Sequence, residues 1–249
     1  MKRIIITSLF VAAICGAAPW SPRSGRGLAQ VPMTGVGLGA PAGGGGGDPS
    51  VWNPSDKNAN ITLSTTTIAN DTATTPSGGG SSWYAVRGTK SYATGTANKV
   101  VFGLVITKLG TAGNGLGWIG GVADGSVSLS NYIGQAAHSF ATESVGGGDY
   151  QDGTGPAFTC SSSVNPGQGV TMYFAVNFNN GHLFCSRDCV TWLGGGDPAA
   201  DTGAAYTLSA ATYFPAWAGG LDAGSDIVQL VTNPSLGGCS NLSGFTTWG

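Results

Sequence analysis

Carboxylates are too few and too scattered in this sequence to support glycoside hydrolysis. A glycosidase needs two carboxylates about 5 to 9 Å apart on either side of the sugar bond. The twelve acidic residues include one glutamate, Glu143, which leaves eleven aspartates, several of them beside glycine or proline where aspartate favours turns. We therefore predict no catalytic pair of acids.

Nucleophilic catalysis and phosphate binding also lack their usual residues. His138 and His182 are the only histidines; one begins an apolar segment and the other lies beside a predicted turn, positions where a structural role is the commoner one. No Gly-x-Ser-x-Gly motif is present, and the glycine-rich segments lack the lysine of a phosphate loop. We predict that the protein is not an enzyme and needs no cofactor.

The cysteines predict disulfide bonds. Cys15 lies in a predicted export signal, which leaves an even set of four, Cys160, Cys185, Cys189 and Cys239, with three ways to pair. We favour Cys185 with Cys189, because the three residues between them would form a loop that places them opposite each other across a hairpin, and this leaves Cys160 with Cys239. Four free thiols are the alternative.

No standard metal site fits the sequence. The Cys-x3-Cys spacing has no second close pair, as a zinc site would require. Asp149 with Asp152, and Asp222 with Asp226, are acids near glycines of the kind that bind calcium, but their spacing fits no standard calcium loop. We predict no metal.

Binding residues are expected in the least hydrophobic loop, Gly146 to Pro156. Tyr150 lies there between Asp149 and Asp152, and an exposed aromatic flanked by acids is typical of a sugar or peptide contact. We predict that these three residues contact a ligand. The alternative is that Tyr150 packs over the edge of the fold.

The clearest structural signal is a β-hairpin between Val170 and Trp192. Apolar residues occupy every second position from Val170 to Phe178, which predicts a strand with one buried and one solvated face. Asn180-Gly181 suits a type I′ turn, in which both central residues have positive φ. This turn would place Phe178 opposite Leu183, and Leu183 and Cys185 on the buried face.

Short apolar segments separated by turn residues continue along the 249-residue chain, which contains 44 glycines and only 9% charged residues. Further strands are expected at Ile61–Leu63, 66–69, Trp83–Thr89, Lys99–Thr107, 116–123, Asn131–Gly134, Ser139–Thr142, Ala205–Leu208, Tyr213–Trp217 and Ile227–Thr232. The tryptophans within these strands, Trp83, Trp118 and Trp217, are expected in the core. We predict an all-β fold, a two-sheet antiparallel β-sandwich forming one domain over residues 51–249.

The N-terminal region has the pattern of an export signal. Residues 1–29 begin with Met1-Lys2-Arg3 and continue with an apolar run from Ile4 to Ala18, shorter than the roughly 20 residues of a membrane span. Cleavage is expected after Ala18 or Ala29, and an uncleaved anchor is the alternative. Residues 30–50 form a Gly/Pro-rich, flexible linker. We predict a secreted or cell-surface protein with no membrane span after signal removal.

The charge balance argues against nucleic acid as a partner. Residues 1–29 contain four of the ten basic residues and none of the acids, so six bases face twelve acids after cleavage, a net charge of −6. The remaining bases are scattered and form no basic run of the kind that phosphate-backbone binding requires.

Several motifs together resemble the SPRY (B30.2-like) domain of the bacterial and phage type, a variant of the concanavalin A-like lectin/glucanase sandwich. The resemblance covers Trp52 to Val231 and is carried by Trp52–Ser64, Trp83–Lys90 with Arg87, Asn131–Gly134, Asn180–Phe184, Gly196–Ala200 and Tyr213–Ala216. Two positions depart from the family pattern. Asp188-Cys189 stands where an Asn-Gly turn is usual, and Asn177 stands where an aspartate is common.

The resemblance implies a non-catalytic binding module that meets a protein or glycan through loops at one end of the sandwich. The signal-like N-terminus favours a secreted or surface-displayed module. The likeness of the segment that begins at Trp52 to phage-borne domains favours the alternative, a structural or receptor-binding component of a phage or prophage virion, such as a tail or fibre appendage.

Overall fold

The computed structural model describes residues 50–65, 71–78, 82–110, 119–143, 149–157, 160, 167–220, 224–234 and 236–249. The predicted signal peptide, nearly all of the linker and the strand expected at 66–69 lie outside these residues. The chain divides into a unit over residues 1–43 and a compact unit over residues 44–249, and the description below concerns the second unit.

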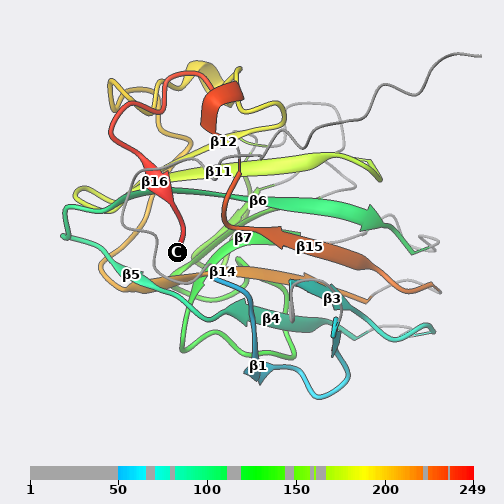
Figure 1. Ribbon diagram of the computed structural model, residues 1–249. Helices are drawn as coiled ribbons and strands as arrows, with labels where there is room; N and C mark the ends of the chain where they lie inside the picture. Colours follow the sequence, from blue (N-terminus) through cyan, green and yellow to red (C-terminus); the bar gives the residue numbers. More distant parts are fainter. Residues whose placement is uncertain are drawn as a thin grey trace, which may run out of the picture. The chain divides into compact units, whose positions relative to one another are not determined.

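Two eight-stranded sheets face each other as the layers of a β-sandwich (Figure 1). The first sheet has the order β1 (Trp52–Lys57), β4 (Tyr84–Gly88), β14 (Thr212–Gly219), β7 (Ile119–Asp124), β8 (Ser139–Glu143), β9 (Asp149–Gln151) and β10 (Thr154–Ala157), and β5 (Tyr92–Ala93) also pairs with β14. The second has the order β13 (Tyr206–Thr207), β12 (His182–Ser186), β11 (Thr171–Asn177), β6 (Lys99–Lys108), β15 (Ile227–Val231), β3 (Thr72–Thr74) and β2 (Thr62–Leu63), and β16 (Thr246–Thr247) runs parallel to β6. Short 3-10 turns occur at η1 (Leu193–Gly195) and η2 (Leu236–Gly238). The predicted all-β, two-sheet antiparallel sandwich is confirmed.

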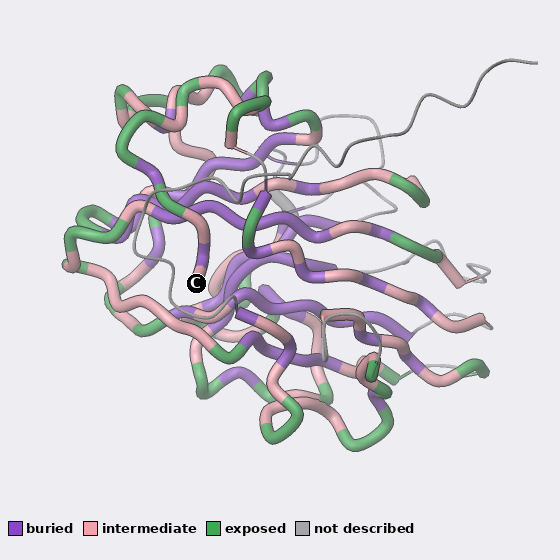
Figure 2. The backbone as a smooth tube through the Cα atoms, in the orientation of Figure 1, coloured by how far each residue is buried: buried purple, intermediate pink, exposed green. Residues whose placement is uncertain are grey.

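The main core lies between the two sheets, where alternate residues of facing strands meet. Figure 2 shows buried backbone along the strands of both layers and exposed backbone mainly in the loops. Phe102 and Phe174 stack across β6 and β11 with ring centroids 5.1 Å apart, and Trp248 packs edge-on against Phe102. The strand β6 is buried on both faces over most of its length, as its nearly continuous apolar sequence predicted.

A cap covers part of the outer face of the second sheet. It is formed by residues 189–205 and 236–245, the yellow and red segments that lie together beyond β12 and β11 in Figure 1. Trp192 and Phe245 of this cap pack on Ala175 and Phe184. Asn177 is consequently only 2% exposed, so the predicted solvated face of this strand is wrong at its C-terminal end.

The central hairpin forms, but its register differs from the predicted one. Val176 pairs with Leu183, and a four-residue loop, 178–181, replaces the two-residue turn. Gly181 has φ +77° and Asn180 has no positive φ, so the predicted type I′ turn is wrong. The reason is that the ring of Phe178 turns into the core and ends the strand at Asn177. Because the register moves by two residues, Leu183 stays on the core face as predicted.

Two other segments differ from their expected structure. Asn131–Gly134 forms turns and bends instead of a strand. The loop expected over Gly146–Pro156 contains the β9–β10 hairpin, whose two-residue turn is Asp152-Gly153 with φ of +47° and +77°. The turn with two positive φ angles therefore occurs here, because an Asp-Gly pair tolerates it as well as Asn-Gly does.

Two disulfide bonds form, Cys160 with Cys185 and Cys189 with Cys239, so the favoured pairing of Cys185 with Cys189 is wrong. Cys185 lies in the core between the sheets, whereas Cys189 lies in the cap on the outer face of the second sheet. The sheet itself separates the two sulfur atoms. The prediction of disulfides in place of free thiols is confirmed.

Candidate binding groove

The outer face of the first sheet carries several small side chains, which let another segment approach it closely. Five buried positions on this face are alanines: Ala85, Ala123, Ala141, Ala216 and Ala218. Residues 125–138, between β7 and β8, lie on this face and bury Val127 and Ile133 against the alanines. The sheet thus gains a second, outer cluster of apolar residues.

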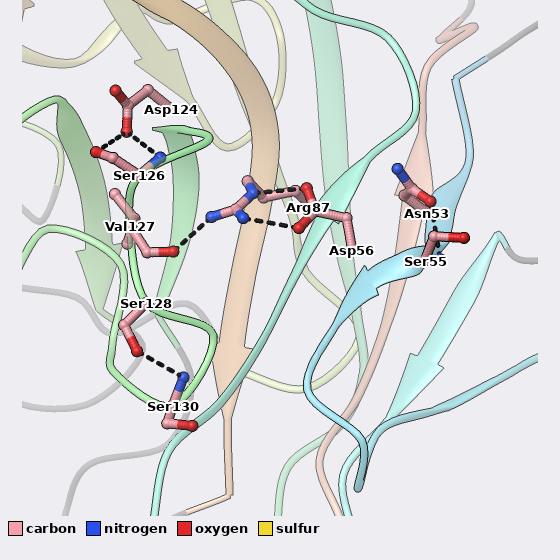
Figure 3. A network of polar contacts seen from close by, with 9 residues as sticks. All are labelled: Asn53, Ser55, Asp56, Arg87, Asp124, Ser126, Val127, Ser128 and Ser130. Carbon is pink, nitrogen blue, oxygen red and sulfur yellow. Dashed lines mark hydrogen bonds and ion pairs between the residues drawn. The ribbon is translucent and has the colours of Figure 1, made fainter.

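Arg87 binds residues 125–138 to the first sheet. Its Nε and Nη2 donate to the two carboxylate oxygens of Asp56 at 2.8 and 2.7 Å, and its Nη1 donates to the carbonyl of Val127 at 2.6 Å (Figure 3). Arg87 is 4% exposed, and a paired, buried guanidinium of this kind is among the stronger polar contacts in proteins. The guanidinium of Arg87 therefore holds both β1 and residues 125–138 against β4.

Asn58, directly after β1, forms further hydrogen bonds that join β1 to β4 and to residues 125–138. Its backbone amide donates to the carbonyl of Ala85 at 2.8 Å, and its side-chain Nδ2 donates to the carbonyl of Leu129 at 3.0 Å and to Ser130 Oγ at 3.3 Å. The Ala85 amide also donates to the Leu129 carbonyl at 2.9 Å. Segments that lie far apart in the sequence are thus held side by side.

A groove of about 480 Å³ lies where these segments meet. It is lined by uncharged side chains only, from Asn58, Asn60, Ser82, Trp83, Tyr84, Ser130, Asn131, Tyr132 and Gln135. Trp83 and Tyr132 are both half-buried, and their ring centroids lie 5.6 Å apart with the planes tilted by 57°. This volume falls within the range of about 300 to 1,000 Å³ that is usual for small-molecule sites.

Much of the hydrogen-bonding capacity of the groove is unused within the protein. Among the described residues, the side-chain amides of Asn60, Asn131 and Gln135 have no hydrogen-bond partner, and neither do the hydroxyls of Tyr84 and Tyr132. Each amide can both donate and accept. The groove therefore offers aromatic surface together with free, uncharged polar groups.

No family model matches the sequence, and the search of curated proteins finds no relative. Among solved structures, the chain is similar to the SPRY domain of human HERC1, with 14% identity, a TM-score of 0.52, and coverage of 72% of this chain and 96% of that one. It is also similar to a human SPRY domain, with 15% identity, a TM-score of 0.51, and coverage of 71% of this chain and 98% of that one. The chain has a SPRY-like fold. The predicted resemblance is confirmed at this level, and the likeness concerns the fold alone.

In this SPRY-like sandwich, Tyr150 lies behind the groove wall. Its ring packs edge-on against Tyr132, with centroids 5.1 Å apart, and its backbone lies against Gly134, where a Cβ atom would come within 2.4 Å of Tyr150 Cβ. The side chain is half-buried, so Tyr150 is less exposed than predicted. Tyr150 supports an aromatic residue that lines the groove and does not line it itself.

Glu143, the single glutamate, is buried beside Tyr150. It is 2% exposed, its Oε2 accepts a hydrogen bond from the Tyr150 hydroxyl at 3.5 Å, and its Oε1 has no partner among the described residues. Burial raises the pKa of Glu143 from 4.5 to about 7, with the Tyr150 hydrogen bond acting in the opposite direction. Burial also raises the pKa of Tyr150, as does the neighbouring Glu143.

The two aspartates predicted to bind with Tyr150 lie elsewhere in the SPRY-like fold. Asp149 is fully buried, and its Oδ2 accepts a hydrogen bond from the backbone amide of Cys160 at 2.5 Å. Asp152 accepts from the backbone amide of Ser139 at 3.2 Å and from the hydroxyl of Tyr206, in the second sheet, at 2.5 Å. Burial and this hydrogen bond raise the pKa of Tyr206. Their role in binding stays a prediction.

None of the residues that line the groove was predicted to bind a ligand. Trp83 was expected in the core, and it is instead half-buried on the outer face, whereas Trp217 is fully buried as predicted and Trp118 lies outside the described residues. One signal for the difference is the polar sequence around Trp83, which follows Ser81-Ser82. The convergence of three distant segments left no pattern in the sequence.

The remaining candidates for chemistry are held in local structural contacts. His138 Nδ1 lies 2.8 Å from Ser209 Oγ, and His182 Nδ1 lies 3.0 Å from Asp201 Oδ1. Asp226 is buried and accepts from the backbone amides of Gly110 and Gly220, while Asp222 lies outside the described residues. Within the part of the chain that the structure describes, no three His, Cys, Asp or Glu side chains gather as a metal site would require. In the same part of the chain there is no helix with the length and apolar character to cross a membrane.

Proposed function

We propose that this protein is a non-catalytic binding module and that the groove beside Trp83 is its ligand site. The observation that carries the proposal is the combination of half-buried aromatic rings with unused, uncharged polar groups in one concave surface. Binding sites commonly join aromatic walls to a few placed polar groups. The ligand is a protein or a carbohydrate on another surface.

The position of the acidic groups supports binding without catalysis. Glu143 lies behind Tyr150 and does not line the groove, and the residues that line it include no carboxylate. Glycoside hydrolysis requires two carboxylates on either side of the bond. A ligand in this groove would meet amides, hydroxyls and rings, and no carboxylate of the kind that glycoside hydrolysis requires.

We further propose that the protein works outside the cytoplasm. Two disulfides are consistent with this location, because disulfides persist mainly in oxidising compartments. The signal-like residues 1–29 and the linker that follows would export the module and hold it away from an attachment point. The alternative, a component of a phage or prophage virion, rests on the likeness of the Trp52 segment to phage-borne domains.

Two observations separate the secreted module from the virion component. N-terminal sequencing of the mature protein should find a start near Gln30 or Pro19 if the signal is cleaved, and such a processed terminus would contradict the virion role. Tail genes on both sides of the coding sequence would contradict the free secreted role.

Binding at the groove can be tested by sedimentation of the full, oxidised chain with cell-envelope fragments of the organism that makes it. The wild-type chain should sediment, and Trp83→Ala should remain in the supernatant. Tyr173→Ala is the matched control, because it removes a half-buried aromatic from the outer face of the other sheet. If all three proteins sediment alike, the groove is not the site, and if the wild-type chain never sediments, the module does not bind that surface.

A further inference from the structure

The ligand of the groove should carry no net charge where it meets the protein. The lining residues have none, and the basic side chains of β1 and β4 already make hydrogen bonds within the protein. Arg87 is bound to Asp56, and Lys57 Nζ donates to the carbonyl of Ile61 at 2.7 Å. A phosphate or carboxylate would lose its hydration here without gaining a counter-charge.

The aromatic residues present surface of the kind that sugar rings cover. Trp83 and Tyr132 form two walls tilted by 57°, and Tyr150 backs Tyr132 from behind. The apolar faces of a pyranose ring can pack on such walls, since aromatic side chains combine a large apolar body with a polar tip. Because both rings are half-buried and braced, they need little ordering when a ligand arrives.

The free polar groups match hydroxyl groups, which both donate and accept hydrogen bonds. Asn60, Asn131 and Gln135 each offer an amide with both functions, and none is used within the described part of the chain. Site amides that are free in the unbound protein can pair with ligand hydroxyls without first breaking an internal bond.

A protein ligand would find little to hold at this place. Peptides often add a strand to a free sheet edge or insert apolar side chains into a groove. The strand β4 has partners on both sides, β1 and β14, and the edge strand β1 ends at Lys57, before the lining residues Asn58 and Asn60. The exposed large hydrophobic residue of the described chain is Val190, which follows Cys189 of the cap on the other sheet.

From these observations we infer that the groove binds an uncharged oligosaccharide, with a sugar ring packed on Trp83 and Tyr132 and its hydroxyls bonded to the amides of Asn60, Asn131 and Gln135. The volume of about 480 Å³ is ample for a segment of a chain. This inference rests on the proposed function, because it names the ligand class of the same site.

The test is calorimetric titration of the full, oxidised chain with neutral hexasaccharides, namely cellohexaose, xylohexaose, mannohexaose and chitohexaose, up to about 5 mM. At least one should bind. Trp83→Ala should weaken that binding at least about tenfold, as loss of an aromatic contact does. Asn131→Ala combined with Gln135→Ala provides a second weakened variant that leaves the aromatic packing intact, and Tyr173→Ala should bind as the wild type does.

Hexagalacturonate, which carries a carboxylate on each ring, is the charged control and should bind no more tightly than the neutral sugars. The inference is overturned if none of the neutral hexasaccharides binds or if hexagalacturonate binds best. It is also overturned if neither Trp83→Ala nor the Asn131→Ala, Gln135→Ala double variant weakens binding. Failure here can be told from failure of the proposed function. Envelope binding that depends on Trp83 and is abolished by protease, without any saccharide binding, would leave the module intact and identify its ligand as a protein.

Discussion

Replacing Glu143 with glutamine should stabilise the protein at pH 8 and have little effect near pH 4. The buried carboxyl has a pKa of about 7, against an ordinary value of 4.5 in the unfolded chain. As the pH rises through this interval, the unfolded chain loses the proton first, so the free energy of unfolding falls. A difference of about 2.5 in pKa corresponds to about 3 kcal/mol, all of it lost once the pH exceeds 7.

Glutamine has the same shape and no proton to lose, so the variant does not incur this cost. Guanidinium unfolding followed by circular dichroism should therefore give equal stabilities for the two proteins at pH 4 to 4.5, and a gap at pH 8 of about 3 kcal/mol in favour of Glu143→Gln. Asp188→Asn is the control. Backbone hydrogen bonds from Thr191 and Val190 lower the pKa of Asp188 to about 2, so Asp188 stays ionised from pH 5 to 8. The effect of Asp188→Asn on the free energy of unfolding should therefore be constant over that range. A gap between wild type and Glu143→Gln that is the same at both pH values would refute the reasoning.

Three further changes test contacts that hold the fold together. Arg87→Met should lower the free energy of unfolding by about 2 to 4 kcal/mol, because it leaves the Asp56 carboxylate without its ion pair, and a loss below about 0.5 kcal/mol in denaturant unfolding would contradict this role. Cys189→Ser with Cys239→Ser should lower the free energy of unfolding by about 2 to 4 kcal/mol, since the bond joins residues 50 positions apart, and should leave ligand binding at the groove unchanged. Non-reducing peptide mapping of the wild type should find this bond, and a Cys185–Cys189 peptide would show that the pairing is wrong. Phe178→Ala should cost about 3 to 5 kcal/mol, measured in the same way, because its ring is fully buried against Trp248, and an effect near that of a surface substitution would exclude this packing.

The sequence predicted which face of each strand is buried better than it predicted where turns fall. Alternation alone places Phe174, Val176 and Leu183 in the core, and all three lie there. The position of the turn depends on the packing of Phe178 in the core against Trp248, which lies 70 residues further along the sequence. Asparagine tolerates a positive φ, but Asn180 does not adopt one, because the packing of Phe178 produces a longer loop.

The disulfides and the groove were harder to predict because each depends on segments that are distant in the sequence. Cys185 and Cys189 are close along the chain, yet Cys185 faces the core from β12, whereas the chain leaves that strand after Ser186 and places Cys189, with φ +60°, in the cap on the outer face. For the ligand site, the sequence favoured the polar loop from Gly146 to Pro156, which contains Asp149 and Asp152. Its residues instead form the β9–β10 hairpin, and Asp149 and Asp152 accept hydrogen bonds from the protein itself.

The groove does have one local trace in the sequence, which is the alternation around β4. Trp83, Ala85 and Arg87 lie at every second position and so share the outer face of the first sheet. Each residue supplies a different requirement of the site. Ala85 is small enough for residues 125–138 to pack closely, Arg87 binds that segment to Asp56 of β1, and Trp83 provides a ring at the opening between them. A strand with this order of large aromatic, small and basic residues on one face can therefore build a braced groove on a surface that would otherwise be flat.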